Sequence, residues 1–206
     1  MRIKIFILLC LTAIMQFTGV TPLKASHYYY KQLSLKDGLT SAVRCILTDK
    51  QGFVWIGTKA GISRYDGHEL KKYVHSQNNP HSIPNNLIHQ IAEDEMSNIW
   101  ILTDKGIARY QRQSDDFFLP TDEKGNPIIA YSTCLTKDGV LFGSKDKVYF
   151  YSYRDSSLRL LQKLNKGSNF NISLLSLWNE HTVLCCSRWQ GLALLDLKTG
   201  KHRLPP

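Results

Sequence analysis

The sequence contains few cysteines, only five among its 206 residues. One of them, Cys10, lies in an apolar segment near the N-terminus, and Cys185 and Cys186 are adjacent. Neighbouring residues in a strand point to opposite faces, so these two thiols are not expected to face one partner. Small secreted domains that depend on disulfides use dense, regularly spaced cysteines instead. The composition therefore excludes a disulfide scaffold, and we expect free, buried cysteines.

Long apolar runs are also missing, apart from one near the N-terminus. Arg2 and Lys4 precede an apolar stretch over residues 5–17, and a polar segment containing Lys24 follows it. A membrane span needs about 20 apolar residues, so this stretch is too short and is typical of a secretory signal peptide. We expect a signal peptide over residues 1–25, export of the chain and no stable membrane span after its removal. An uncleaved N-terminal anchor is the alternative.

Charge of one sign is not concentrated anywhere in the chain. The 26 basic and 17 acidic side chains give a formal net charge of +9. Removal of residues 1–25 takes away three basic and no acidic side chains, which leaves +6. A charge of this size favours solubility, and the scattered lysines and arginines form no basic patch. We therefore expect no nucleic-acid partner.

Patterns of catalytic or metal-binding residues are absent as well. The seven histidines lack the paired spacing of metal sites, and no calcium loop of alternating acidic residues occurs. The glycines form no phosphate-binding loop, and no serine lies in a nucleophile elbow. The adjacent Asp115 and Asp116 are interpreted as part of a solvated turn. The residues predict no cofactor, no metal and no enzymatic activity of this chain.

What the sequence does contain is an internal repeat. Residues 49–66 (DKQGFVWIGTKAGISRYD) and residues 94–111 (DEMSNIWILTDKGIARYQ) align without a gap at a spacing of 45 residues. Two weaker copies follow at residues 137–152 and 182–196, and the last has one extra residue in its central loop. A period of about 40 to 45 residues is typical of four-stranded propeller blades.

We therefore predict an all-β fold, a β-propeller of four-stranded antiparallel blades with about four blades present over residues 26–206. The blades are expected at residues 41–80, 86–120, 127–165 and 171–206. The inner strands are expected to be apolar and the outermost strand polar, because only the outer edge meets water. Trp55 and Trp100 lie in mid-strand and in register, so they are expected to pack between blades rather than to stack on a ligand.

The number of strands bears on whether the ring is complete. An additional outer strand is expected over residues 28–35, and the fourth copy has its own outer segment at residues 201–204. One surplus outer strand beside four blades indicates an incomplete ring that lacks at least one later blade. Because propellers have about four to eight blades, a closed four-bladed ring is the structural alternative.

Binding is favoured over catalysis by the loops between the second and third strands of the blades. In a propeller these loops open on one face near the central channel, where an aromatic plane and polar groups suit hydroxyl-rich or acidic sugars. Trp189 is the most informative residue, because its loop carries the extra residue. Ordinary polar loops are the alternative interpretation. The candidate ligand-binding residues are Lys59, Asn85, Asn86, Asp104, Lys105, Lys145, Arg188 and Trp189.

Several segments resemble the two-component regulator propeller repeat. They are GFVWIGTKAGISRYDG (residues 52–67), NIWILTDKGIARY (98–110), the linking segment YVHSQNNPHSIPNN (73–86) and the opening segment LSLKDGLTSAVRCILTD (33–49). In that family the repeats form the periplasmic sensor region of hybrid two-component system histidine kinases. This chain shows no transmembrane, kinase or phospho-accepting segment, so the resemblance implies an N-terminal fragment of such a sensor.

The resemblance implies a periplasmic, ligand-sensing propeller that recognises an oligosaccharide. A homodimer or another sensor chain is a further expected partner. Two other functions stay open at this point. One is an exported propeller enzyme that acts on polysaccharide, as a lyase or a glycosidase. The other is an interaction scaffold or a nonfunctional gene fragment.

Overall fold

The computed structural model describes residues 32–39, 41–164 and 170–203 of the chain. The signal peptide predicted over residues 1–25 lies outside the described residues, as does most of the strand predicted over residues 28–35. The described end of that segment contains no strand and leads into a short 3₁₀ helix, η1 (Leu35–Asp37). No helix within the described ranges is both long and apolar enough to cross a membrane.

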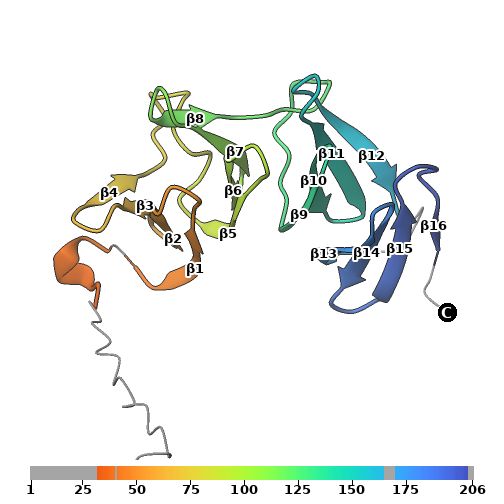
Figure 1. Cartoon of the computed structure of the whole chain (residues 1–206), viewed down its shortest axis with the longest axis horizontal. Helices are drawn as coiled ribbons and strands as arrows, with labels where there is room; N and C mark the ends of the chain where they lie inside the picture. The colour runs from red at the N-terminus through yellow and green to blue at the C-terminus, as the bar shows by residue number, and fades with distance from the viewer. Residues whose placement is uncertain (1–31, 40, 165–169, 204–206) are drawn as a thin grey trace, which may run out of the picture. The chain divides into compact units, whose positions relative to one another are not determined.

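The described strands form four antiparallel sheets of four strands each (Figure 1). The first sheet contains β1 (Val43–Thr48), β2 (Val54–Thr58), β3 (Gly61–Tyr65) and β4 (Leu70–Tyr73). The second contains β5 (Ile88–Glu93), β6 (Ile99–Thr103), β7 (Gly106–Gln111) and β8 (Asp116–Phe118). The third contains β9 (Ser132–Thr136), β10 (Gly139–Ser144), β11 (Lys147–Ser152) and β12 (Leu158–Lys163). The fourth contains β13 (Ile172–Asn179), β14 (Thr182–Ser187), β15 (Gly191–Asp196) and β16 (His202–Arg203).

Each sheet is a meander in which the strands follow their order in the chain. Among the described residues, the strands form four separate sheets, and no sheet closes on itself. The prediction of an all-β, incomplete β-propeller is therefore confirmed. The extra residue of the fourth repeat lies in the β14–β15 turn, where Ser187 pairs with Gly191, whereas Thr58 pairs with Gly61 in the first repeat.

The two repeated tryptophans pack between the sheets, as predicted, and both are fully buried. The indole N–H of Trp55 donates to Asp49 Oδ2 at 2.9 Å, and that of Trp100 donates to Asp94 Oδ2 at 2.7 Å. The Asp49 side chain also accepts the backbone N–H of Phe53, which closes the β1–β2 turn. In each of the first two repeats, one aspartate therefore joins the turn to a buried indole.

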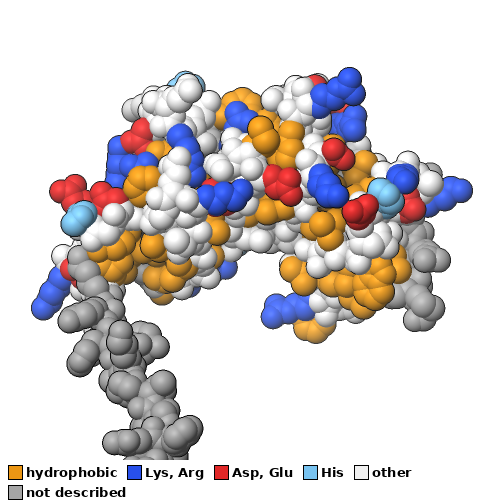
Figure 2. Space-filling view, viewed as in Figure 1, with side chains coloured by type: hydrophobic (Ala, Val, Ile, Leu, Met, Phe, Trp, Pro, Cys, Tyr) orange, Lys and Arg blue, Asp and Glu red, His pale blue; other side chains and the backbone are white. Residues whose placement is uncertain are grey.

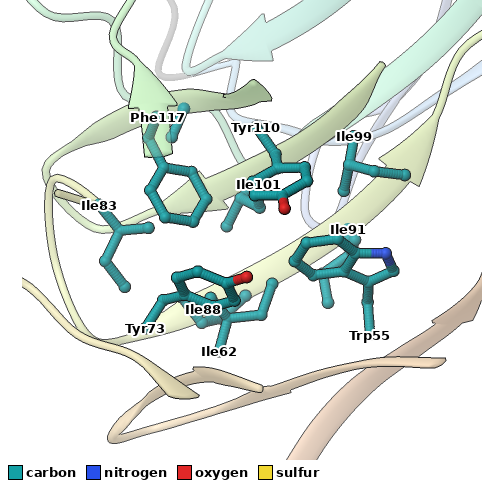
Figure 3. Close-up of a cluster of buried hydrophobic side chains, with 11 residues drawn as sticks. Trp55, Ile62, Tyr73, Ile83, Ile88, Ile91, Ile99, Ile101, Tyr110 and Phe117 are labelled. Carbon is teal, nitrogen blue, oxygen red and sulfur yellow. The ribbon is translucent and has the colours of Figure 1, made fainter. Parts of the chain in front are cut away.

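The junction between the first and second sheets is built from aromatic rings (Figure 3). Trp55 meets Tyr110 of β7 edge-on, with ring centroids 4.8 Å apart, and Tyr73 meets Phe117 in the same way at 5.3 Å. Arg64 of β3 donates a hydrogen bond to the Tyr110 hydroxyl. Aromatic pairs in this geometry contribute about 0.5–1.5 kcal/mol beyond the area they bury.

The second junction repeats this arrangement and the third does not. Trp100 meets Tyr151 edge-on at 4.7 Å, and Arg109 donates to the Tyr151 hydroxyl at 2.6 Å. In the third junction, Leu141 takes the position of the tryptophan and Leu195 that of the tyrosine. Both leucines are fully buried in one apolar cluster. The aromatic and polar contacts of the first two junctions are thus replaced together by apolar packing.

The inner strands β1 and β13 are apolar in sequence but less buried than the inner strands β5 and β9 of the middle sheets. No residue of β1 is fully buried, and in β13 only Ile172 and Leu175 are buried. β5 contacts both the first and the third sheet, and β9 contacts both the second and the fourth. The first and fourth sheets each have one neighbouring sheet among the described residues, so one face of each inner strand there meets no other sheet.

Asp115, at the β7–β8 turn, links the first two sheets. Its carboxylate accepts hydrogen bonds from the hydroxyls of Tyr73 at 2.6 Å and Tyr110 at 2.5 Å, and it pairs with the ammonium group of Lys71. Burial raises the pKa of Asp115, but these donors outweigh that effect and hold the pKa at about 2. The backbone φ of 55° places Asp115 in the left-handed region, which non-glycine residues rarely adopt.

We expect Asp115 to make the stability of the fold sensitive to acid. The pKa of an aspartate in an unfolded chain is about 3.9, so the unfolded state binds the proton first. The stabilisation is complete above about pH 5 and is lost as the pH falls towards about 2. Between these limits the wild type should lose about 1–2 kcal/mol more of its unfolding free energy than the Asp115→Asn variant.

Urea unfolding followed by circular dichroism at several pH values between these limits measures this difference. Asp138→Asn, at an exposed position of the β9–β10 turn, is the matched control and should keep the acid sensitivity of the wild type. Parallel pH dependence of the wild type and the Asp115→Asn variant would contradict the role assigned to Asp115.

Candidate functional site

The loops that were predicted to bind a ligand lie at corresponding ends of their sheets. We call this end, formed by the turns β2–β3, β6–β7, β10–β11 and β14–β15, the site end. Connections between neighbouring sheets also reach it. The Gly61 N–H donates to the Asn86 carbonyl at 2.8 Å, and the Ile172 N–H donates to the Lys145 carbonyl at 2.8 Å. These hydrogen bonds between neighbouring sheets therefore fix the backbone near the predicted residues.

Asn85 and Asn86 order the start of the second sheet. Asn85 Oδ1 accepts the backbone N–H of Leu87 at 2.9 Å, and Asn86 Oδ1 accepts that of His75 at 2.7 Å. Both asparagines are partly buried. Their side-chain oxygens thus hold the segment that connects β4 to β5.

The cationic residues of the predicted set and Trp189 are exposed to solvent. The guanidinium of Arg188 lies 5.9 Å from the ring centroid of Trp189, which is 84% exposed. The backbone of Lys145, in the β10–β11 turn, has a φ of 48° and is therefore in the left-handed conformation. Within the described residues, no hydrogen bond or ion pair joins any two of the eight predicted residues. The fold brings them to the site end without bringing them into one cluster.

Asp104 is paired with His89, which is not among the eight predicted residues. Its Oδ1 lies 2.5 Å from His89 Nε2, and the imidazole meets the ring of Tyr131 edge-on at 5.3 Å. The His89 side chain is 16% exposed, that of Asp104 43%, and Tyr131 as a whole 39%. A carboxylate, an imidazole and a phenol are therefore accessible together at the site end, between the second and third sheets.

His89 occupies a β-bulge that recurs at one position of the repeat. The register between the first two strands shifts at this position in the first, second and fourth sheets, and the third sheet has no such shift. The extra residues are Arg44, His89 and Ser173. A bulge leaves one residue outside the pairing and redirects its side chain, and bulges are common beside binding sites. These bulge residues, which sequence reasoning missed, belong to the candidate site.

A signal for these three residues was available in the sequence. The first, second and fourth repeats can be aligned on Thr58, Thr103 and Ser187. In this alignment each inner strand begins with an apolar residue, and the polar bulge residue follows it directly. Three polar residues in one column of an otherwise apolar strand indicate a position that faces away from the core. Their pairing could not be read without the strand register.

A surface pocket of about 510 Å³ lies at the opposite end of the second sheet. It is lined by the β5–β6 turn, the end of β7 and the β7–β8 turn, and it contains none of the eight predicted residues. Both arginines that line the pocket already donate hydrogen bonds to other side chains of the protein. Arg112 donates to Asp49 at 3.1 Å and to Gln51 at 2.7 Å, and Arg109 donates to Tyr151. We therefore interpret this pocket as part of the structural contact between repeats.

The four cysteines that the structure describes are free, as predicted, but only Cys134 and Cys185 are buried, whereas Cys45 and Cys186 are partly buried. Cys185 is fully buried, and burial raises the pKa of its thiol to about 12. Among the described residues, no group of three or more histidine, cysteine or acidic side chains is placed to hold a metal ion.

Comparison with known proteins bears on the first repeat. Residues 37–60 match the family model of the two component regulator propeller. The chain carries a two component regulator propeller repeat. This propeller repeat spans the Asp49 turn and β2 with Trp55. A stretch of 56 residues is 41% identical to Histidine kinase P4 of Formosa agariphila, and it covers 27% of this chain and 4% of that protein.

Two solved structures share the fold of the propeller repeats. The extracellular domain of BT3049 from B. thetaiotaomicron, assigned to a hybrid two component system, matches with a TM-score of 0.70 and 18% identity over 85% of this chain and 26% of that one. The extracellular domain of BT4673 from the same organism, assigned to a one component system, matches with a TM-score of 0.67 and 19% identity over 82% and 26%. At these identities the likeness shows the propeller fold, and this chain spans about a quarter of each domain.

Proposed function

We propose that the chain is a ligand-sensing propeller domain of a two-component sensor and that it works in the periplasm. The observation that carries the proposal is the propeller repeat at residues 37–60, on a chain whose described sheets are propeller blades. The similarity to a segment of a histidine kinase supports it further. In this proposal the chain supplies the sensing part of the sensor.

The proposed ligand is a carbohydrate bound at the site end. Trp189 presents a nearly fully exposed ring, which suits the apolar face of a sugar. The pair formed by Asp104 and His89 offers an acceptor and a donor for hydroxyl groups, and Tyr131 adds a second exposed aromatic ring. Lys59, Lys105 and Lys145 are exposed at the same end and favour an acidic sugar.

Replacing Trp189 with alanine is expected to weaken carbohydrate binding at least tenfold, because the largest exposed apolar surface at the site end is removed. Isothermal titration calorimetry with a panel of neutral and acidic oligosaccharides measures the affinity. Trp178→Ala is the matched control, since Trp178 is also exposed, at 66%, but lies at the other end of β13. Its affinity should stay within about twofold of the wild type. Absence of binding to every oligosaccharide, or equal losses in both variants, would contradict a carbohydrate site at this end.

The contact between His89, Asp104 and Tyr131 favours one second candidate, an exported polysaccharide lyase. A carboxylate that orients an imidazole next to a phenol can serve general acid–base chemistry. Release of reducing ends from polysaccharides by the wild type, and its loss in a His89→Gln variant, would support this candidate. Binding without any release, with affinity lowered in the same variant, would support the sensor.

A further inference from the structure

The inner strands of the second junction, β5 and β9, approach each other less closely than those of the other two junctions. In the first and third junctions, Gly57 and Gly143 let the next inner strand come close, since an added Cβ would meet Ile88 in one and Ile172 in the other. The equivalent residue of the second sheet is Leu102, which is fully buried. Figure 2 shows that side chains fill the space between the second and third sheets. The distance between β5 and β9 is therefore set by side chains rather than by close backbone contact.

One side chain joins these two inner strands. Gln90 Oε1 accepts the backbone N–H of Thr133 at 3.1 Å. Gln90 pairs with Leu102, Thr133 pairs with Phe142, and both of these partners fill the second junction. Directly paired residues share one face of a sheet, so the side chains of Gln90 and Thr133 also face this junction. Within the described ranges, no other hydrogen bond links β5 to β9.

The bridge lies next to the contact between His89 and Tyr131. His89 directly precedes Gln90, and the bulge belongs to the second sheet. Tyr131 lies two residues before Thr133, and its N–H donates to the Gly143 carbonyl at 3.0 Å, which fixes it to the third sheet. The two rings, whose centroids are 5.3 Å apart, are therefore held by different sheets. Their separation depends on how Gln90 holds the two sheets together.

Thr133 also carries a polar group that is available to a ligand. The residue is 8% exposed, and its hydroxyl has no hydrogen-bond partner among the described residues. Buried polar groups in folded proteins are nearly always paired, so an unpaired one calls for an explanation. This hydroxyl faces the second junction, beside the bridge. A hydroxyl-bearing ligand that binds across the junction can supply the missing partner.

We propose that Gln90 is a positioning residue of the ligand site and that the ligand binds across the second junction. By holding the third sheet to the second at the site end, Gln90 keeps Tyr131 against His89 and so preorganises the surface that the ligand meets. Gln90 acts on the ligand through Tyr131. This inference rests on the carbohydrate site proposed above and gives it a place, between the second and third sheets.

A measurement without ligand tests the positioning role. In the wild type, NMR should show a nuclear Overhauser effect between the ring protons of Tyr131 and those of His89. Gln90→Met has a side chain of similar length but no acceptor for the Thr133 N–H, so this effect should be lost. Gln90→Glu provides an acceptor again and should retain it. Gln111→Met is the matched control, because it removes a side-chain hydrogen bond of the second sheet at the end opposite to the site, and it should also retain the effect.

The affinity for the ligand links this ring contact to binding. Isothermal titration calorimetry with the oligosaccharide panel should show binding weakened about tenfold in Gln90→Met, and within about twofold of the wild type in Gln90→Glu and Gln111→Met. A ring contact that survives Gln90→Met, or an affinity that stays unchanged when the contact is lost, would overturn the proposal. If the wild type binds no oligosaccharide, the carbohydrate site fails, whereas loss of the ring contact in Gln90→Met still supports the positioning of Tyr131 by Gln90.

Gln90→Asn is the second variant if Gln90→Met fails to fold, as judged by circular dichroism. Its amide is one methylene shorter and does not reach the Thr133 N–H, so the same losses of ring contact and affinity are expected. Retention of both in a folded Gln90→Asn variant would equally overturn the role of Gln90.

Discussion

Replacing Trp55 with alanine is expected to lower the free energy of unfolding by about 3–5 kcal/mol. The indole is fully buried, and its ring centroid lies 4.8 Å from that of Tyr110 and 6.1 Å from that of Tyr73. Its removal leaves a cavity next to these two rings. The carboxylate of Asp49, which is itself buried, also loses its indole donor. Because domains of this kind are stable by about 5–15 kcal/mol, the loss removes a large part of the total.

Urea unfolding followed by circular dichroism measures the effect. Trp178→Ala is the control, because this tryptophan is 66% exposed, and its unfolding free energy should change by at most about 0.5 kcal/mol. Equal losses for the two variants would show that the repeated tryptophan does not hold the junction.

Trp55→Phe separates the packing of the ring from the hydrogen bond of the indole. Burial raises the pKa of Asp49, but the donors Trp55, Arg112 and the Phe53 N–H outweigh it, and the net pKa is below its usual range. In the phenylalanine variant, Arg112 and the Phe53 N–H still hold the carboxylate. We expect a loss of about 1–2 kcal/mol, well below that of the alanine variant. A phenylalanine variant as unstable as the alanine variant would assign most of the effect to the indole N–H.

The sequence was informative about the junctions because their residues are rare types repeated without a gap. Trp55 and Trp100 recur with an aspartate six residues before them and an arginine nine residues after them, and all of these groups meet in the structure. In the third junction, Leu141 and Leu195 take the positions of the tryptophan and the tyrosine. Leucine is common in every strand, so its role there became visible only through packing.

The candidate site was less predictable than the fold, for two physical reasons. The contact of His89 with Asp104 depends on a bulge, and a bulge is a property of strand pairing rather than of composition. The exposure of Ile46 and Leu174 depends on how many sheets surround each strand.

The first two sheets approach each other closely at Gly57. An added Cβ would lie 2.5 Å from Cys45 Sγ and 2.8 Å from Ile88 Cγ2. Ile88 is fully buried, so it has little room to move. Gly57 has no positive φ, and a substitution there is limited by space alone. Gly57→Val should therefore lower the free energy of unfolding by about 3 kcal/mol through overpacking.

A double-mutant cycle with Ile88→Ala distinguishes overpacking from a loss of strand stability. Ile88→Ala alone should cost about 2–4 kcal/mol, but it removes the atom that the new side chain meets. The double variant should therefore be more stable than the sum of the two losses predicts, by at least about 1 kcal/mol. Additive losses would show that the two sheets do not meet at this glycine.

The residue equivalent to Gly57 differs between the sheets, so the effect of side-chain size at this position can be compared within the chain. Gly143 is equivalent to Gly57, and its added Cβ would lie 2.7 Å from Ile172 Cγ2, so Gly143→Val should be about as costly. In the second sheet the equivalent residue is Leu102, which is fully buried within its junction. Leu102→Gly should therefore destabilise by opening a cavity, although it makes this repeat more like its neighbours. If unfolding measurements showed Leu102→Gly to be neutral, the close approach of the sheets would not be set by the residue at this position.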